Sequence, residues 1–230
     1  MNFIKFIFWE PVKKILGAFS KAYLISLKII LLNYLSYFYF TNSTNRMDKK
    51  IIKFFQHCKD LVFLEVGASN GIDCSNTLLL ERKYKWTGFL IEPILNDFKI
   101  CKKLRKKSYT SRNILVSNET FSKKKYLEIH PDYLQTSLSE NITKSNENEF
   151  VETITLDDFF KLNGIKNIDI FILDVEGYEI EVLEGYNEKS KIIKYLLVES
   201  WNFKEFKEYS MKKGWSFLSQ YGKDDYLFKL

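Results

Sequence analysis

Residues 61–71 have the sequence LVFLEVGASNG, an apolar run that ends in a glycine turn. A segment with helical periodicity follows, and a second apolar run, GFLIEP at residues 88–93, ends in an acid. Two apolar runs on either side of a helix predict the first β-α-β unit of an open α/β sheet. Ligands of such sheets bind beyond the carboxyl ends of the strands, so we expect a nucleotide-sized site beside Gly67, Gly71 and Glu92.

The spacing of the two glycines narrows the kind of ligand. A dinucleotide site has the pattern G-x-G-x-x-G, and this turn lacks the central glycine that lets the backbone approach a pyrophosphate. The turn alone is also typical of an ordinary strand-to-helix connection. Glu92, however, can accept hydrogen bonds from both ribose hydroxyls, which favours a nucleoside without phosphates, such as S-adenosylmethionine. Glu65, Ser69 and Asn70 would then offer polar atoms to the amino-acid end of that ligand.

Composition limits the class of protein. The chain has 230 residues, 46% hydrophobic and 17% aromatic, with few Gly and Pro, which favours one folded α/β domain with an appendage. A net charge of +6 suits anionic surfaces without demanding nucleic acid, and no DNA- or RNA-binding signature is present. Cys58, Cys74 and Cys101 are odd in number and widely spaced, which predicts reduced thiols in a cytoplasmic protein and neither a disulfide framework nor a zinc site.

Residues 1–50 form an N-terminal appendage and linker, and residues 51–230 are expected to be the folded domain. Residues 22–40 are apolar or aromatic apart from Lys28, Asn33 and small polar residues. A spanning helix would hold Lys28 near its middle at a cost of about 2.5–3.5 kcal/mol, so a pair of helices lying on a membrane surface is the better interpretation. Packing on the domain itself, or on a second subunit in a homodimer, is the open alternative.

The middle of the chain carries weaker candidates for the site. Residues 113–116 predict the third strand, which would place Ser117 and Asn118 where an adenine edge lies. His130 precedes a polar segment of the length of a functional loop, and it is kept as a candidate general base. A lone histidine before proline is also typical of a structural or exposed side chain.

Charge and residue pattern predict the structure of two further segments. The run KKLRKK at residues 102–107 predicts a solvated cationic helix end, because lysine and arginine stabilise that end of the helix dipole. Residues 125–129 are expected to extend the edge of the sheet.

The second half predicts strands and helices at clear boundaries. The expected elements are strands at 151–154, 168–173 and 195–198, helices at 156–162 and 179–183, and a closing antiparallel hairpin of 215–219 with 226–230. A parallel sheet that ends with a reversed strand is typical of methyltransferase-like sheets. Asp174 and Glu176 follow the buried strand at 168–173, so this carboxylate pair is predicted to lie on the same rim as Glu65 and Glu92.

Five segments together resemble the FkbM family of S-adenosylmethionine-dependent methyltransferases. They are FLEVGASNG (63–71), SNT (75–77), GFLIEP (88–93), ITLDDFF (154–160) and IDIFILDVEGYEIEVLEG (168–185). The resemblance covers residue 61 to the end. It implies a Rossmann-like class I methyltransferase fold: a mostly parallel sheet flanked by helices, with a final antiparallel strand. It also implies methyl transfer from S-adenosylmethionine, often to a sugar or another hydroxyl. Ser69 and Asn70 depart from the commoner family form, which has Asn-Asp there.

These observations define a candidate site. The predicted cofactor-binding residues are Glu65, Gly67, Ala68, Ser69, Asn70, Gly71, Glu92, Pro93, Ser117, Asn118 and Asp174. The catalytic candidates are Asp174, Glu176 and His130, one of which would take the proton of a glycan or glycolipid hydroxyl. No metal is predicted, since the spacing of Asp174, Glu176 and Glu199 does not indicate a divalent-ion site.

Two other functional classes stay open at this point. An NAD(P)-dependent oxidoreductase would share the sheet and the ribose-binding acid. A catalytically silent, membrane-associated binding module would keep the fold without methyl transfer.

Overall fold

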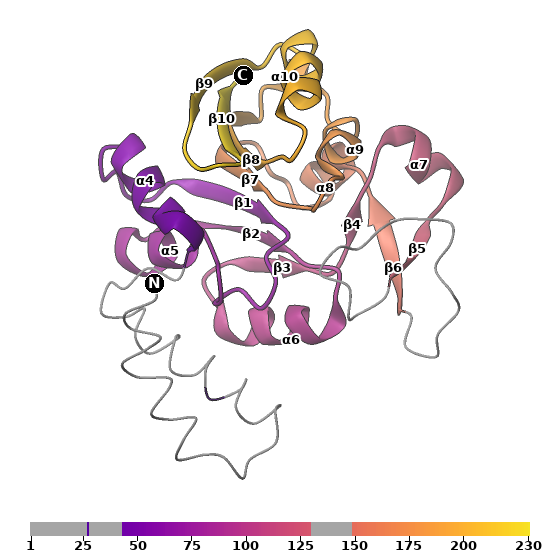
Figure 1. The fold of residues 1–230 in the computed structure, drawn as a ribbon. Coiled ribbons are helices and arrows are strands. Elements are labelled where there is room, and N and C mark those ends of the chain that lie inside the picture. Colours follow the sequence, from indigo (N-terminus) through magenta and orange to yellow (C-terminus); the bar gives the residue numbers. More distant parts are fainter. Residues whose placement is uncertain (1–26, 28–42, 130–148) are drawn as a thin grey trace.

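The computed structural model describes residue 27, residues 43–129 and residues 149–230. Its centre is a seven-stranded sheet in the order β3-β2-β1-β7-β8-β10-β9 (Figure 1). The strands are β1 (Val62–Val66), β2 (Thr87–Ile91), β3 (Tyr109–Ser111), β7 (Ile168–Leu173), β8 (Ile193–Glu199), β9 (Ser216–Gln220) and β10 (Asp225–Lys229). The strands from β3 to β8 pair in parallel, whereas β10 is antiparallel to both β8 and β9. This topology confirms the Rossmann-like methyltransferase fold and the closing hairpin predicted from the sequence.

Helices cover both faces of this sheet. One layer consists of α4 (Met47–Phe54), α5 (Leu78–Tyr84) and α6 (Leu95–Leu104), and the other of α8 (Leu156–Leu162), α9 (Glu179–Leu183) and α10 (Phe203–Lys212) (Figure 1). Strand residues alternate between the layers, as the two-residue period of a strand requires. Phe63 belongs to the cluster with α4 and α5, while its neighbour Leu64 belongs to the cluster with α8 and α9. Because both faces are buried, the central strands are nearly continuous hydrophobic runs.

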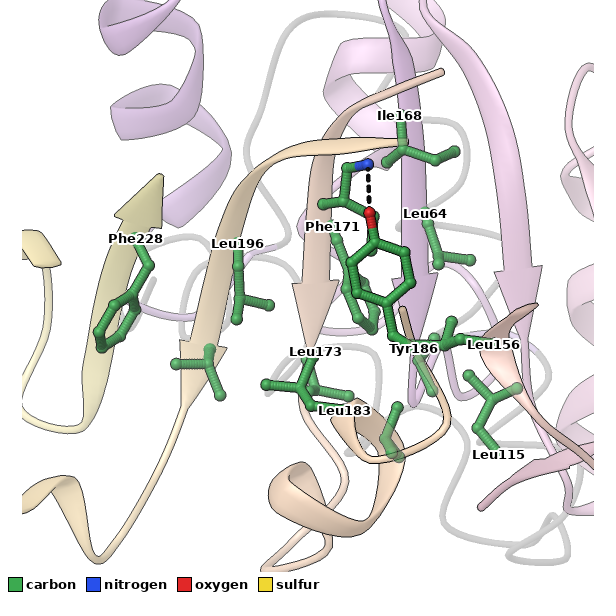
Figure 2. Packing of buried hydrophobic residues seen from close by; sticks show 14 of the residues in the cluster. Leu64, Leu115, Leu156, Ile168, Phe171, Leu173, Leu183, Tyr186, Leu196 and Phe228 are labelled. Atoms are coloured by element: carbon green, nitrogen blue, oxygen red, sulfur yellow. Dashed lines mark hydrogen bonds between the residues drawn. The ribbon is translucent and has the colours of Figure 1, made fainter. Parts of the chain in front are cut away.

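The larger core cluster lies between the sheet and the second layer (Figure 2). Phe171 and Leu196 from adjacent strands are fully buried there. Tyr186 packs its ring into the same cluster, and its hydroxyl accepts a hydrogen bond of 3.1 Å from the backbone N–H of Ile193 (Figure 2). The polar atom of this tyrosine is therefore satisfied at a strand end, which allows the ring to be buried.

A separate three-stranded sheet corrects two of the predictions. It has the order β4-β6-β5, with β4 (Ile114–Leu115), β5 (Tyr126–Ile129) and β6 (Glu149–Ile154), and α7 (Asn118–Lys123) lies between β4 and β5 in the chain. The prediction that residues 113–116 form the third strand of the main sheet is wrong, because β3 takes that place and β4 pairs with β6. Residues 125–129 do form a strand, but it pairs with β6 and does not extend the main sheet. Arg112 holds the chain at the point of divergence by donating to the Pro93 carbonyl at 3.0 Å and to Glu149.

Helix boundaries differ from the predictions at the N-terminal side of the domain. The helix α4 begins at Met47, four residues before the predicted start of the domain, and both Met47 and Asp48 are buried. It follows a short 3-10 helix, Thr44–Arg46, and a second one, Glu188–Ser190, precedes β8. The helix α10 had no counterpart in the prediction. The helices α8 and α9 are confirmed at their predicted bounds.

Within the described residues no helix is long and apolar enough to cross a membrane. Residues 1–40, which are expected to contact a membrane, lie outside the described residues apart from residue 27, and so does the candidate His130.

Candidate functional site

A cavity of about 460 Å³ opens beyond the carboxyl ends of β1, β2 and β7. The sheet order places β2 and β3 on one side of β1, and β7 and β8 on the other, so the cavity lies where the direction of strand addition reverses. This is the position at which open α/β sheets bind ligands. The predicted site residues that line it are Glu65, Gly67, Ala68, Ser69, Asn70, Glu92, Pro93, Asp174 and Glu176.

The turn after β1 forms the floor of the cavity. Gly67 has φ +83°, and a Cβ atom at this position would lie 1.9 Å from the backbone oxygen of Asp174, so only glycine lets the ends of β1 and β7 come this close. The N–H groups of Gly67 and Ala68 both donate to the Ile91 carbonyl at 3.1 Å. The turn is thus fixed to both neighbouring strands.

Glu92 follows β2 and points into this turn. Its carboxylate accepts hydrogen bonds from the backbone N–H of Ser69 at 2.8 Å and of Ile94 at 2.9 Å. Burial raises the pKa of Glu92 to about 7, against the effect of these two donors, and Asp97 adds a smaller contribution in the same direction. A carboxylate has about four acceptor positions, so two remain for ligand hydroxyls on the cavity side.

Glu65 and Arg105 are buried beside the loop at residues 75–77 and hold it in place. Oε1 of Glu65 accepts from the backbone N–H of Asn76 at 2.9 Å, and Oε2 accepts from the hydroxyls of Thr77 and Ser75. The guanidinium of Arg105 lies 4.0 Å from the same carboxylate. Burial raises the pKa of Glu65, and Arg105 opposes that shift. Glu65 lines the cavity, but most of its hydrogen-bonding capacity orders the loop at residues 75–77.

The structure corrects the interpretation of residues 102–107 as a solvated helix end. Lys102, Lys103, Lys106 and Lys107 are exposed, but Arg105 between them is fully buried, with an exposed fraction of 0%. Gly71, predicted to contact the cofactor, packs against Arg105 instead and does not line the cavity: a Cβ atom there would meet Cγ of Arg105 at 2.9 Å. The arginine missed by sequence reasoning is therefore the centre of the network beneath the predicted turn.

Two acids, Asp174 and Glu199, lie at the carboxyl ends of β7 and β8. Burial raises the pKa of Asp174 to about 8, and the charges of Glu199 and Glu176 add to this effect. Asp174 and Glu199 are hydrogen-bonded to each other, and burial raises the pKa of Glu199 as well. The backbone of Glu176 is left-handed, with φ 54°, and its pKa is raised by partial burial. Across the described residues, no group of three or more His, Cys, Asp or Glu side chains is arranged to hold a metal ion.

Two predicted residues lie away from the cavity. Ser117 caps α7 by accepting from the N–H of Thr120 at 3.1 Å, and its own N–H donates to Glu181. Asn118 donates to the Glu184 carbonyl at 3.1 Å. Neither residue lines the cavity, because β4, the strand that precedes them, belongs to the second sheet and not to the main one.

Other residues that line the cavity had not been predicted, among them Asn76, Ile94, Asp97, Asn113 and Tyr178. Asp97 gave a usable signal, since it lies in the first turn of the helix that begins just after the Glu92-Pro93 pair. The sequence around Asn113 gives no such signal, because the position of Asn113 at the cavity depends on the chain leaving the main sheet at this point. Burial also raises the pKa of Asp97, as it does that of Glu92 on the same side of the cavity.

Comparison with known proteins gives the following matches. A family model described as the methyltransferase FkbM domain matches residues 65–224. No curated protein sequence matches the chain. The human methyltransferase 10 domain containing protein is 12% identical, with a TM-score of 0.46 over 80% of this chain and 81% of that one. Aeropyrum pernix fibrillarin, solved with natively bound S-adenosyl-L-methionine, is 8% identical with a TM-score of 0.43 over 75% and 67%. The M. capricolum TrmK complex with S-adenosyl-homocysteine is 12% identical, with a TM-score of 0.38 over 78% and 66%.

Proposed function

The chain belongs to the FkbM methyltransferase family, and from this premise we propose that it transfers the methyl group of S-adenosylmethionine to a hydroxyl oxygen of a sugar or another small acceptor. The observation that carries the proposal is the position of Asp174, which lines the cavity that would hold the cofactor and is hydrogen-bonded to Glu199 at the end of β8. Burial raises the pKa of Asp174 to about 8, so its ionised form is a stronger base than an ordinary aspartate and is suited to take a hydroxyl proton.

The residues of the cavity suit S-adenosylmethionine. A volume of about 460 Å³ lies within the usual range for ligand pockets, about 300–1,000 Å³. Glu92, with acceptor capacity left on a side chain that is only 5% exposed, would bind the two ribose hydroxyls. Ile94, Asp97 and Asn113 would enclose the base, and the polar atoms around Ser69 would face the amino-acid end.

The transfer itself needs alignment and removal of one proton. S-adenosylmethionine supplies an electrophilic methyl group on a sulfonium. The chain would contribute orientation of the acceptor oxygen against that methyl group, which is worth up to about 7–11 kcal/mol when two reactants are held in line. Asp174 would accept the hydroxyl proton, and Glu199 would share the resulting proton through their hydrogen bond. Glu176 at the same rim would hold the acceptor by its hydroxyls.

An assay with the purified full chain tests this proposal. The protein is incubated with S-adenosylmethionine labelled in the methyl group and with a panel of glycans and lipid extracts, and labelled products are identified. We expect label in an alkali-stable ether of a glycan or glycolipid. Label on RNA or protein in place of a glycan would refute the acceptor class. Binding of NAD(P) with no binding of S-adenosylmethionine would favour the oxidoreductase.

We further propose that residues 1–40 attach the protein to membranes at their surface. The support is the sequence of residues 22–40, in which apolar and aromatic residues surround Lys28. Protein lacking residues 1–40 should still bind the cofactor and lose sedimentation with vesicles. If both forms sediment equally, packing against the domain or formation of a homodimer becomes the better explanation for these residues.

A further inference from the structure

Lysine predominates on the outer surface of α6 and of the segment that follows it. Lys99, Lys102 and Lys103 are exposed at a spacing that places them on one face of α6, and Lys106 and Lys107 are exposed just beyond the helix end. We call these five lysines, 99, 102, 103, 106 and 107, the basic face.

The acids of the layer formed by α4, α5 and α6 do not neutralise the basic face. Asp48 is 1% exposed and Glu81 is 3% exposed, and Glu81 is already bonded to Arg105. Asp97 lines the cavity. Of the acids within residues 43–107, only Asp60 belongs to the exposed class.

The opposite layer provides an internal comparison. On α10, Glu205 and Glu208 are exposed together with Lys204 and Lys212, so both signs alternate along that surface. Alternation of this kind is the usual pattern of a solvated helix. The excess of lysine on the first layer therefore differs from the mixed surface of α10 and indicates a partner of negative charge.

We propose that the basic face docks on the surface of an anionic lipid bilayer, independently of any methyl transfer. A lipid partner is favoured over nucleic acid because residues 22–40, which precede the first helix of this layer, are apolar or aromatic apart from Lys28 and a few small polar residues. Stable attachment to a membrane commonly needs two signals, an apolar segment and a basic cluster. Each lysine held near an anionic surface strengthens binding by about fivefold, and the effect decays within a Debye length.

The test compares two variants of the full chain that lose the same charge. The basic-face variant carries Lys99→Gln, Lys102→Gln, Lys103→Gln and Lys106→Gln. The control variant carries Lys161→Gln, Lys166→Gln, Lys204→Gln and Lys212→Gln, all at exposed positions on the other side of the sheet. Binding is measured by sedimentation with vesicles of phosphatidylcholine alone, vesicles of phosphatidylcholine mixed with phosphatidylserine, and a duplex RNA. Circular dichroism and binding of S-adenosyl-homocysteine report whether each variant is folded.

We expect the wild type to prefer the anionic vesicles, and the basic-face variant to lose at least about tenfold in that binding while the control variant loses less than about threefold. Binding to neutral vesicles, which reports the apolar residues, should be equal in all three proteins. No preference of the wild type for anionic vesicles would overturn the proposal, as would an equal loss in both variants. A selective loss of RNA binding alone would identify nucleic acid as the partner instead. A double variant, Lys102→Gln with Lys106→Gln, should show an intermediate loss even if the fourfold variant does not fold.

Discussion

Replacing Arg105 by methionine should destabilise the protein more than any change at the neighbouring lysines. The guanidinium donates to the carboxylate of Glu81 at 3.1 Å, to the Gly71 carbonyl at 2.9 Å, and to the hydroxyls of Ser75 at 3.0 Å and Thr77 at 2.8 Å. Methionine keeps most of the apolar stem of the side chain and removes the charge and all of these donors. Removing one partner of a buried ion pair costs about 3–5 kcal/mol, because the remaining charge is left uncompensated.

At about 2–4 °C for each kcal/mol in a domain of this size, that loss lowers the melting temperature by roughly 6–20 °C. Thermal unfolding followed by circular dichroism measures the change, and Lys106→Met is the matched control on the exposed side of the same run. Binding of S-adenosyl-homocysteine, followed by calorimetry at a temperature where Arg105→Met is folded, should also weaken, because the loop held by Arg105 contributes Asp73, Cys74 and Asn76 to the cavity wall. A melting temperature for Arg105→Met within about 2 °C of the Lys106→Met value would refute this account of the network.

Three further predictions concern the acids of the cavity. Glu92→Ala should weaken S-adenosylmethionine binding by ~2–3 kcal/mol in calorimetry, since two hydroxyls lose a charged acceptor, and unchanged affinity in a folded variant would remove Glu92 from the site. Asp174→Asn should keep cofactor affinity within a few-fold and slow single-turnover transfer by ~10²–10⁴, with a smaller effect for Glu176→Gln; normal turnover would end the assignment of Asp174 as the base. The pKa of Asp174 is raised from 3.8 to about 8, so the folded state binds more protons than the unfolded state between these values and its stability falls as pH rises through them. Asp174→Asn should therefore melt above the wild type at pH 8 and close to it at pH 4, and the opposite order would contradict the raised pKa.

Parts of this fold were predictable because local sequence and tertiary contacts agree. The run at β7 is apolar apart from Asp169 and is buried along its whole length, so its composition and its environment give the same assignment. Thr155 was a visible cap for α8, and its side chain does accept from the N–H of Asp158. The positions at which β1 and β2 end could be predicted from Gly67 and Glu92, since glycine allows a tight turn after a strand and an acid after the second strand can bind ribose hydroxyls.

The errors arose where a distant residue decides the outcome. Residues 113–116 have the composition of a strand, but which sheet they join depends on their pairing with β6 and on the bond of Arg112 to Glu149, and both partners lie far along the chain. Arg105 lies among four lysines in the sequence, so its charge predicted a side chain exposed to solvent. Its burial depends on Glu81, which lies on another helix, and on the Gly71 carbonyl. Long-range hydrogen bonds of this kind leave no periodic signal in the sequence.

The acids around the cavity fall into two groups by the charges that face them. Glu65 and Glu81 lie against Arg105, which offsets part of the cost that burial imposes on the ionised form of Glu65 and helps to hold the loop at residues 75–77. Asp174 is largely shielded from solvent and lies next to other acids, and both conditions disfavour its ionised form. A fold gains no stability from placing Asp174 next to Glu199 and Glu176. Strained or electrostatically unfavourable groups are retained mainly where they serve a site, and here the unfavourable group lies at the strand end that Gly67 allows to approach the turn after β1. In the proposed function, the side of the cavity formed by Glu65 and Glu92 would hold the cofactor, and the rim at the ends of β7 and β8 would take the proton of the acceptor.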